Sequence, residues 1–116
     1  MVKLAVIGSR GFNDYNLLKS VLEPVKNQIS LIISGGAKGA DTLAERFANE
    51  NNIETLIFIP DWSKGKRAGY ERNKQIVEAC DIIITFWDGK SKGTQHSFKL
   101  AEKYNKRIKI IKYNGL

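Results

Sequence analysis

Short apolar segments alternate with amphipathic ones along this chain, and this alternation restricts the fold more than any other feature. The apolar segments are rich in β-branched residues and are bounded by Gly, Pro, Asp or Asn, as buried parallel strands are. They are Val2–Ile7, Leu31–Ile33, Thr55–Ile59, Ile82–Trp87 and Ile108–Ile111. The segments between them, near 15–27, 40–51, 68–79 and 94–105, repeat apolar residues at the spacing of a helix.

The regular order of strand and helix predicts an α/β fold. Right-handed crossovers between parallel strands favour a three-layer, doubly wound parallel sheet of five strands, with four helices covering its two faces. The 116 residues fit one domain, 1–116, and leave little room for a second.

Several broad classes of protein are disfavoured by composition. No apolar run approaches the roughly 18 residues that a membrane span needs. A single lysine precedes the run Leu4–Ile7 and Gly-Ser-Arg follows it, so we expect a first strand rather than a signal peptide, and a cytoplasmic protein. One cysteine, Cys80, allows no internal disulfide. With only one histidine, His96, few metal-ligand sets remain, so no metal site is predicted.

The positive charge is concentrated near the end of the chain. The net charge is +7, and residues 90–116 carry eight basic side chains against Glu102 alone. Such a basic region favours anionic partners such as nucleotides or nucleic acid. It fits equally well a solvated helix and edge strand whose charges promote solubility.

The loops that leave the carboxyl ends of the predicted strands are the expected place for a ligand. In doubly wound sheets, ligands bind beyond these ends, next to the point where the strand order reverses. The loops at the opposite edge, near Gln28, Asn52 and Asn105, are shorter and contain no glycine. The candidate loops are Gly8–Gly11, Ser34–Gly39, Pro60–Trp62 and Asp88–Thr94.

The second of these loops, with the sequence SGGAKGAD, is similar in composition to a phosphate cradle. Its glycines allow backbone amides to approach an oxyanion, and the following helix would present free N–H groups. It matches neither G-x-G-x-x-G nor GxxxxGK[ST], which disfavours a dinucleotide oxidoreductase and an NTPase. The alternative is a tight strand-to-helix turn with positive φ. The candidate ligand-binding residues here are Ser34, Gly35, Gly36, Lys38, Gly39 and Asp41.

The loop GKSKGT after the fourth strand repeats this chemistry with two glycines, two hydroxyls and two lysines. Its candidate ligand-binding residues are Gly89, Ser91, Gly93 and Thr94. We also expect Thr94 to be the N-cap of the last helix.

The first and third loops supply guanidinium and aromatic groups. Arg10, beside Gly8 and Ser9, can form paired hydrogen bonds with a phosphate or carboxylate, or it is a surface charge. The segment DWSKGKRAGYERN could stack a base and bind its phosphates, although Trp62 could instead cover the edge of the core. Trp87 and Cys80 are expected in the core, and His96 has no partner that the sequence identifies. The candidates in the third segment are Trp62, Arg67, Arg72 and Asn73.

Four segments together resemble the YspA-like branch of the SMF/DprA–LOG (SLOG) superfamily over nearly the whole chain. They are AVIGSRGFNDY, SGGAKGADTLAE, the IPDW and KGKRAGYERN stretch, and DIIITFWDGKSKGT. The resemblance implies a Rossmann-like sheet of strand order 3-2-1-4-5. It also implies that the loops after the first, second and fourth strands surround a nucleotide-type ligand.

Two groups within that superfamily imply different functions. LOG phosphoribohydrolases carry PGGxGTxxE at the later loop. Here Gly93 and Thr94 match its GT, but Ser97 occupies the position of the catalytic Glu, which disfavours hydrolysis of an N-glycosidic bond. DprA-type proteins, which bind single-stranded DNA, carry a similar first loop and a second loop similar to SGGAKGAD. This second match includes Ser34, Gly35, Lys38, Gly39 and Asp41.

Three functional hypotheses therefore remain open. The first is a module that binds a nucleotide-derived small molecule, such as a nucleotide or an ADP-ribose-like ligand, with Asp41 organising the second loop or accepting a hydrogen bond from a ribose hydroxyl. The second is a hydrolase of such molecules that uses Asp41, Asp88 or Glu71. The third is binding of single-stranded nucleic acid by the basic C-terminal region. No cofactor is certain, and a homo-oligomer is compatible with a domain of this size.

Overall fold

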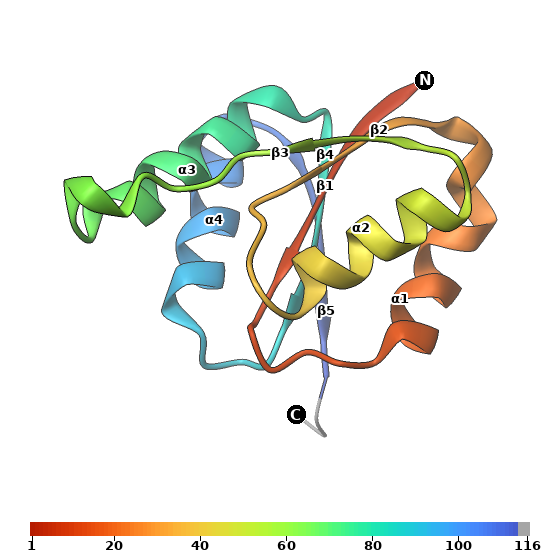
Figure 1. Ribbon diagram of the computed structural model, residues 1–116, viewed down its shortest axis with the longest axis horizontal. Helices are drawn as coiled ribbons and strands as arrows, with labels where there is room; N and C mark the ends of the chain where they lie inside the picture. Colours follow the sequence, from red (N-terminus) through yellow and green to blue (C-terminus); the bar gives the residue numbers. More distant parts are fainter. Residues whose placement is uncertain (114–116) are drawn as a thin grey trace.

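The computed structural model describes residues 1–113, and strands and helices alternate along them (Figure 1). The strands are β1 (Val2–Gly8), β2 (Ile29–Ser34), β3 (Glu54–Ile57), β4 (Ile82–Trp87) and β5 (Arg107–Lys112). The α-helices are α1 (Tyr15–Leu22), α2 (Ala40–Glu50), α3 (Arg67–Ala79) and α4 (Lys92–Lys103). Two 3₁₀ segments, η1 (Glu23–Gln28) and η2 (Trp62–Lys64), lie between them.

The five strands form one parallel sheet in the order β3-β2-β1-β4-β5, which confirms the predicted fold class and strand order. The chain builds outward from β1 through β2 to β3, then returns to the other side of β1 with β4. The order therefore reverses between β1 and β4, and beyond these two strands the chain continues to α1 and α4, which cover opposite faces of the sheet. This is where a doubly wound sheet accommodates a ligand.

Each face of the sheet is covered by a pair of helices. Successive side chains of a strand point to opposite faces, so Leu4 and Val6 of β1 contact α1 and α2, whereas Ala5 and Ile7 lie on the side of α3 and α4. Figure 1 shows α3 and α4 together on the left and α1 and α2 on the right. The two apolar clusters fix the sheet between the layers, and Cys80 lies in the second cluster, as predicted.

Several predicted boundaries are wrong; β2, for example, spans Ile29–Ser34 rather than Leu31–Ile33. The first α-helix ends at Leu22 rather than near residue 27, because Pro24 lacks the N–H that the next helical hydrogen bond requires, and a 3₁₀ segment follows. Strand β3 ends at Ile57 rather than Ile59, because its partner β2 ends at Ser34, which pairs with Ile57. Helix α4 begins at Lys92, two residues earlier than predicted.

The N-cap of α4 is Ser91 and not Thr94, which corrects the prediction from the sequence. The side-chain oxygen of Ser91 accepts a hydrogen bond from the backbone N–H of Thr94 at 3.4 Å. Thr94 therefore lies inside the first turn of the helix, where its side chain is buried.

None of the helices within residues 1–113 is long and apolar enough to cross a membrane. In the same part of the chain, no group of three or more His, Cys, Asp or Glu side chains is arranged to hold a metal ion.

Thr85 provides a test of the packing within β4. Its side chain is fully buried, and its hydroxyl has no hydrogen-bond partner among the described residues. Because a buried hydroxyl without a partner costs stability, Thr85→Val should raise the free energy of unfolding by about 1 kcal/mol. Urea denaturation would measure the change. The same substitution at exposed Thr55 is the control, and a loss of stability in Thr85→Val would contradict this account of the site.

Candidate ligand-binding site

A cavity of about 430 Å³ lies at the carboxyl ends of β1 and β4, where the strand order reverses. Its volume falls within the range of small-molecule sites. The residues that line it come from the β1, β2 and β4 loops and from helices α2, α3 and α4. They are Ile7, Gly8, Ser9, Arg10, Gly11, Ala37, Asp41, Arg72, Asn73, Ile76, Asp88, Ser91, Gly93, Thr94 and Ser97.

The β1 and β4 loops are tied together by Ser9. Its backbone N–H donates to the carbonyl of Phe86 at 2.9 Å, and its hydroxyl accepts from the N–H of Asp88 at 3.1 Å. Ser9 is buried, whereas the following Arg10 is exposed and lines the cavity. The serine is thus a structural link that positions Arg10 at the mouth of the cavity.

The β4 loop is held in shape by Asp88. Its Oδ1 accepts hydrogen bonds from the backbone N–H groups of Lys90 and Ser91, both at 2.8 Å. These two bonds hold the pKa of Asp88 below its ordinary value, because they favour the ionised form. Asp88 shapes the turn into α4, and the first turn of that helix brings Gly93 and Thr94 to the cavity.

The β2–α2 loop depends on a buried carboxylate. Asp41 is 3% exposed, and its Oδ2 accepts a hydrogen bond from the N–H of Gly35 at 2.6 Å. Burial raises the pKa of Asp41 to about 6, although the Gly35 hydrogen bond and the nearby charge of Arg72 act in the opposite direction. This geometry supports one of the two roles predicted for Asp41, that of organising the second loop.

Arg72 of α3 crosses to the same loop. Its Nη1 donates to the carbonyl of Gly35 at 2.6 Å, and its Nε donates to Oδ1 of Asn73 at 3.0 Å. Burial lowers the pKa of Arg72, the charge of Asp41 raises it, and the charge of Arg10 lowers it. Arg10 and Arg72 are therefore close enough to repel each other, and both line one cavity. Such a pair favours an anion between or beside the two groups.

Two glycines of the β2–α2 loop are required by its backbone conformation and packing. Gly36 has φ +67° and Gly39 has φ +87°, so the turn with positive φ that the sequence suggested is present. A Cβ atom on Gly39 would also collide with the backbone carbonyl of Ser9, which means that this glycine packs the second loop against the first. Neither glycine lines the cavity, and a binding role for them stays a prediction.

The structure brings together part of the predicted set of site residues. Those that line the cavity are Gly8, Ser9, Arg10, Asp41, Arg72, Asn73, Ser91, Gly93 and Thr94. Two others, Ser34 and Gly35, are buried beside it, where Ser34 donates to Glu45 at 3.2 Å. The remaining ones, which do not line it, are Gly36, Lys38, Gly39, Trp62, Arg67 and Gly89.

Trp62 and Arg67 lie away from the cavity because the chain after β3 departs from the sheet edge. The side chain of Trp62 is 56% exposed in η2, so it does not cover the core, and it faces Gly69. Arg67 forms an exposed ion pair with Glu71 at 3.8 Å. Glu71, a candidate catalytic carboxylate, is thus outside the cavity as well.

Several lining residues escaped the sequence analysis. Ile76 and Ser97 lie on the cavity side of α3 and α4, one turn beyond Asn73 and Thr94. Helical spacing from those candidates was a signal that could have found them. The partner of His96 could not be found this way, because Asn73 lies on another helix. The amide Nδ2 of Asn73 is 3.3 Å from Nδ1 of His96.

Comparisons with known proteins agree with this fold. The sequence profile of the YspA, cpYpsA-related SLOG family matches residues 2–65. The Gene 61 protein of Mycobacterium phage D29 is 31% identical over 113 residues, which cover 89% of this chain and 90% of that protein. These matches confirm the resemblance found in the sequence.

Two solved structures have a similar fold. DNA processing protein A (DprA) from Streptococcus pneumoniae superposes with a TM-score of 0.83 at 24% identity, over 98% of this chain and 51% of that one. DprA from Helicobacter pylori, whose structure is described with its single-stranded DNA binding mode, superposes with a TM-score of 0.72 at 22% identity. The superposition covers 98% of this chain and 66% of that one. This chain therefore spans about half of the first protein and about two thirds of the second.

The pKa of Asp41 leads to a prediction about pH and stability. Because this pKa rises from 3.8 to about 6 on folding, ionisation of Asp41 is harder in the folded state, and the contribution of Asp41 to stability falls as the pH rises from about 4 to 7. The shift corresponds to about 3 kcal/mol. Asp41→Asn keeps an acceptor for the Gly35 N–H and removes this titration. Urea denaturation across that pH range should show the wild type losing stability relative to the variant, and parallel curves would contradict the assignment.

Proposed function

This chain belongs to the YspA, cpYpsA-related SLOG family, and from that membership and the lining of the cavity we propose that it binds a nucleotide-derived small molecule through its phosphate groups. The observation that carries the proposal is the presence of two guanidinium groups, those of Arg10 and Arg72, at one cavity beyond the sheet. Guanidinium groups match the geometry of phosphate oxygens and form charge-assisted hydrogen bonds with them.

The two arginines have different parts in this proposal. Arg72 is already hydrogen-bonded to the Gly35 carbonyl and to Asn73, so its position is set before a ligand arrives. Arg10 is exposed on its loop and is free to close on a phosphate. The first turn of α4, with Gly93 at the cavity, adds the backbone N–H groups of a helix N-terminus and the positive end of the helix dipole.

Binding without turnover is favoured over hydrolysis by the state of the carboxylates. Asp41 accepts a hydrogen bond from Gly35, and Asp88 accepts two from its own turn. Glu71 lies outside the cavity. Ser97 lines the cavity, and its hydroxyl donates to the carbonyl of Gly93 at 3.3 Å. Each candidate acid or base is thus either engaged in a structural hydrogen bond or located outside the cavity.

Replacement of Arg10 tests the proposal. AMP should stabilise the wild type against heat and adenosine should do so weakly, because the site recognises the phosphate. Arg10→Ala should change the free energy of unfolding by less than about 0.5 kcal/mol, since Arg10 is exposed on a loop. Its affinity for AMP in calorimetric titration should fall by about 2 kcal/mol, roughly thirtyfold.

The matched control for Arg10→Ala is Arg107→Ala, an exposed arginine at the start of β5 that does not line the cavity. Equal stabilisation by AMP and adenosine, or unchanged affinity in Arg10→Ala, would contradict the proposed phosphate site.

Single-stranded nucleic acid is the second candidate ligand, and the basic C-terminal region favours it. Lys103, Lys109 and Lys112 are exposed on α4 and β5, whereas Lys106 donates to the carbonyl of Cys80 at 2.8 Å and has a structural role. The Helicobacter pylori DprA is described as binding single-stranded DNA. None of these three lysines lines the cavity, so a strand that they hold would lie outside it.

Salt dependence separates the two ligands. Strand binding should weaken with a log–log slope of roughly −0.7 per phosphate neutralised, whereas AMP should show a shallow slope. The triple variant Lys103→Gln, Lys109→Gln, Lys112→Gln should lose affinity for an oligonucleotide and keep its affinity for AMP. Loss of AMP binding in a folded triple variant would show that the proposed site is in the wrong place.

A further inference from the structure

A second hollow, of about 440 Å³, lies on the surface formed by α3 and α4. It is lined by Tyr70, Lys92, Gln95, His96 and Lys99, and we call it the α3–α4 groove. Gln95, His96 and Lys99 follow Lys92 by three, four and seven positions, so all four lie on one side of α4. The helices α3 and α4 pack side by side in Figure 1, which places Tyr70 across from this row.

Asn73 connects the α3–α4 groove to the cavity that holds Arg10 and Arg72. It lines that cavity, and its amide Nδ2 is 3.3 Å from Nδ1 of His96, which lines the groove. The two hollows are therefore separated by about one side chain. A ligand that occupies both hollows would pass over the Asn73–His96 contact.

This connection also determines what His96 offers to a ligand. Oδ1 of Asn73 accepts from Nε of Arg72 at 3.0 Å, so the other side of the amide, the donor Nδ2, faces the histidine. Nδ1 of His96 must then be an acceptor, and the neutral ring carries its proton on Nε2. Burial lowers the pKa of His96, in agreement with a neutral ring. The Nε2–H is a hydrogen-bond donor at the groove.

The rest of the groove combines an aromatic surface with positive charge. The Tyr70 side chain is 53% exposed, and its ring meets the ring of His96 edge to face, with centroids 4.5 Å apart. Within residues 1–113, neither Lys92 nor Lys99 lies within ion-pair distance of a carboxylate. The amide of Gln95 supplies a donor and an acceptor. A base with its phosphate would find both an aromatic surface and cations here.

We propose that the α3–α4 groove binds a second nucleotide unit of the ligand held at Arg10 and Arg72, with its base against Tyr70 and its phosphate at Lys99. The preferred ligand is then a compact dinucleotide rather than a mononucleotide. This inference rests on the proposed function of the first cavity. It extends that proposal by assigning a second subsite and the size of the ligand.

The test compares AMP with the 5′-phosphorylated dinucleotide pApA by calorimetric titration at one salt concentration. The wild type should bind pApA about tenfold more tightly than AMP, the gain expected when the second base stacks on Tyr70 while its phosphate contacts Lys99. Tyr70→Ala and Lys99→Gln should each remove most of that gain and leave AMP affinity within about twofold. Tyr70→Phe keeps the aromatic ring and should retain the gain.

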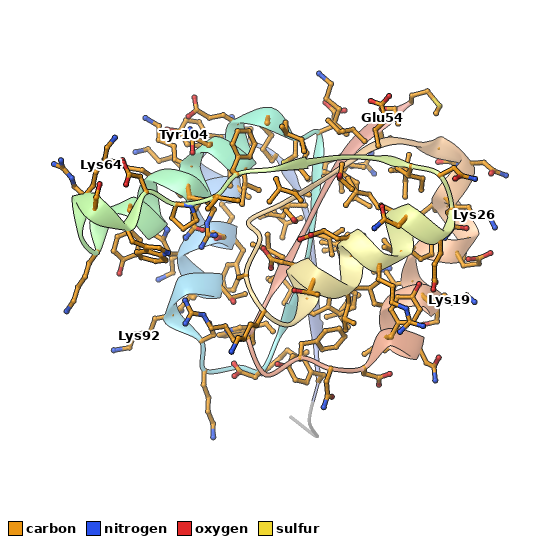
Figure 2. All side chains as sticks on the ribbon, in the orientation of Figure 1. Lys19, Lys26, Glu54, Lys64, Lys92 and Tyr104 are labelled. Carbon is orange, nitrogen blue, oxygen red and sulfur yellow. The ribbon has the colours of Figure 1, made fainter. Side chains whose placement is uncertain are left out.

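The charge control is Lys19→Gln, which removes the same charge from α1. Lys19 lies on the opposite side of the molecule from Lys92 in Figure 2 and lines neither hollow. Equal affinities of the wild type for AMP and pApA would overturn the second subsite, as would equal effects of Lys99→Gln and Lys19→Gln on pApA. If a ligand of six nucleotides binds a further tenfold more tightly than pApA, the preferred ligand is a nucleic-acid strand, and the proposal of a compact dinucleotide is wrong.

The experiments distinguish failure of the second subsite from failure of the phosphate site at Arg10 and Arg72. If AMP binds and Arg10→Ala weakens it, but pApA gains nothing, only the second subsite is wrong. If neither AMP nor pApA binds, or Arg10→Ala changes neither affinity, the phosphate site itself is wrong and the groove proposal fails with it.

Discussion

The buried carboxylate of Asp41 is the interaction on which the rest of the site depends. It accepts the N–H of Gly35, while Arg72 donates to the carbonyl of the same residue, so one glycine peptide is held from two sides. This arrangement fixes the β2–α2 loop and brings α3 to it. Arg72 then hydrogen-bonds to Asn73, which reaches His96 of α4. Loop, cavity and groove thus form a continuous polar network from β2 to α4.

The same network explains why two positive groups can share the cavity. An isolated guanidinium that is partly buried loses hydration, and a second one nearby makes that loss more costly. The charge of Asp41, which lines the same cavity, raises the pKa of Arg72 and so offsets part of this cost. A phosphate at the cavity would add negative charge beside both Arg10 and Arg72. The proposed ligand therefore completes a charge arrangement that the fold leaves open.

Much of this arrangement could be predicted from the sequence, because strand ends and helix faces are local properties. The position of Arg10 follows directly from where β1 ends, and Asp41 and Arg72 follow from the loop and helix that carry them. The structure does not bring Trp62 and Arg67 to the cavity, because the chain after β3 leaves the sheet edge, and this loop has no periodicity from which that course could be predicted. The contact between Asn73 and His96 depends on how α3 packs against α4, which no local pattern specifies.

The most direct test of the central claim, that an anion binds beside Arg10 and Arg72, is an NMR titration of the isotopically labelled protein with AMP. The account predicts the largest shifts at the Nε–H signals of Arg10 and Arg72 and at the backbone amides of Gly11 and Gly93, all of which line the cavity. Signals from α1 and the amino ends of the strands should remain unchanged. Shifts confined to β5, or none near the two arginines at saturating AMP, would contradict it.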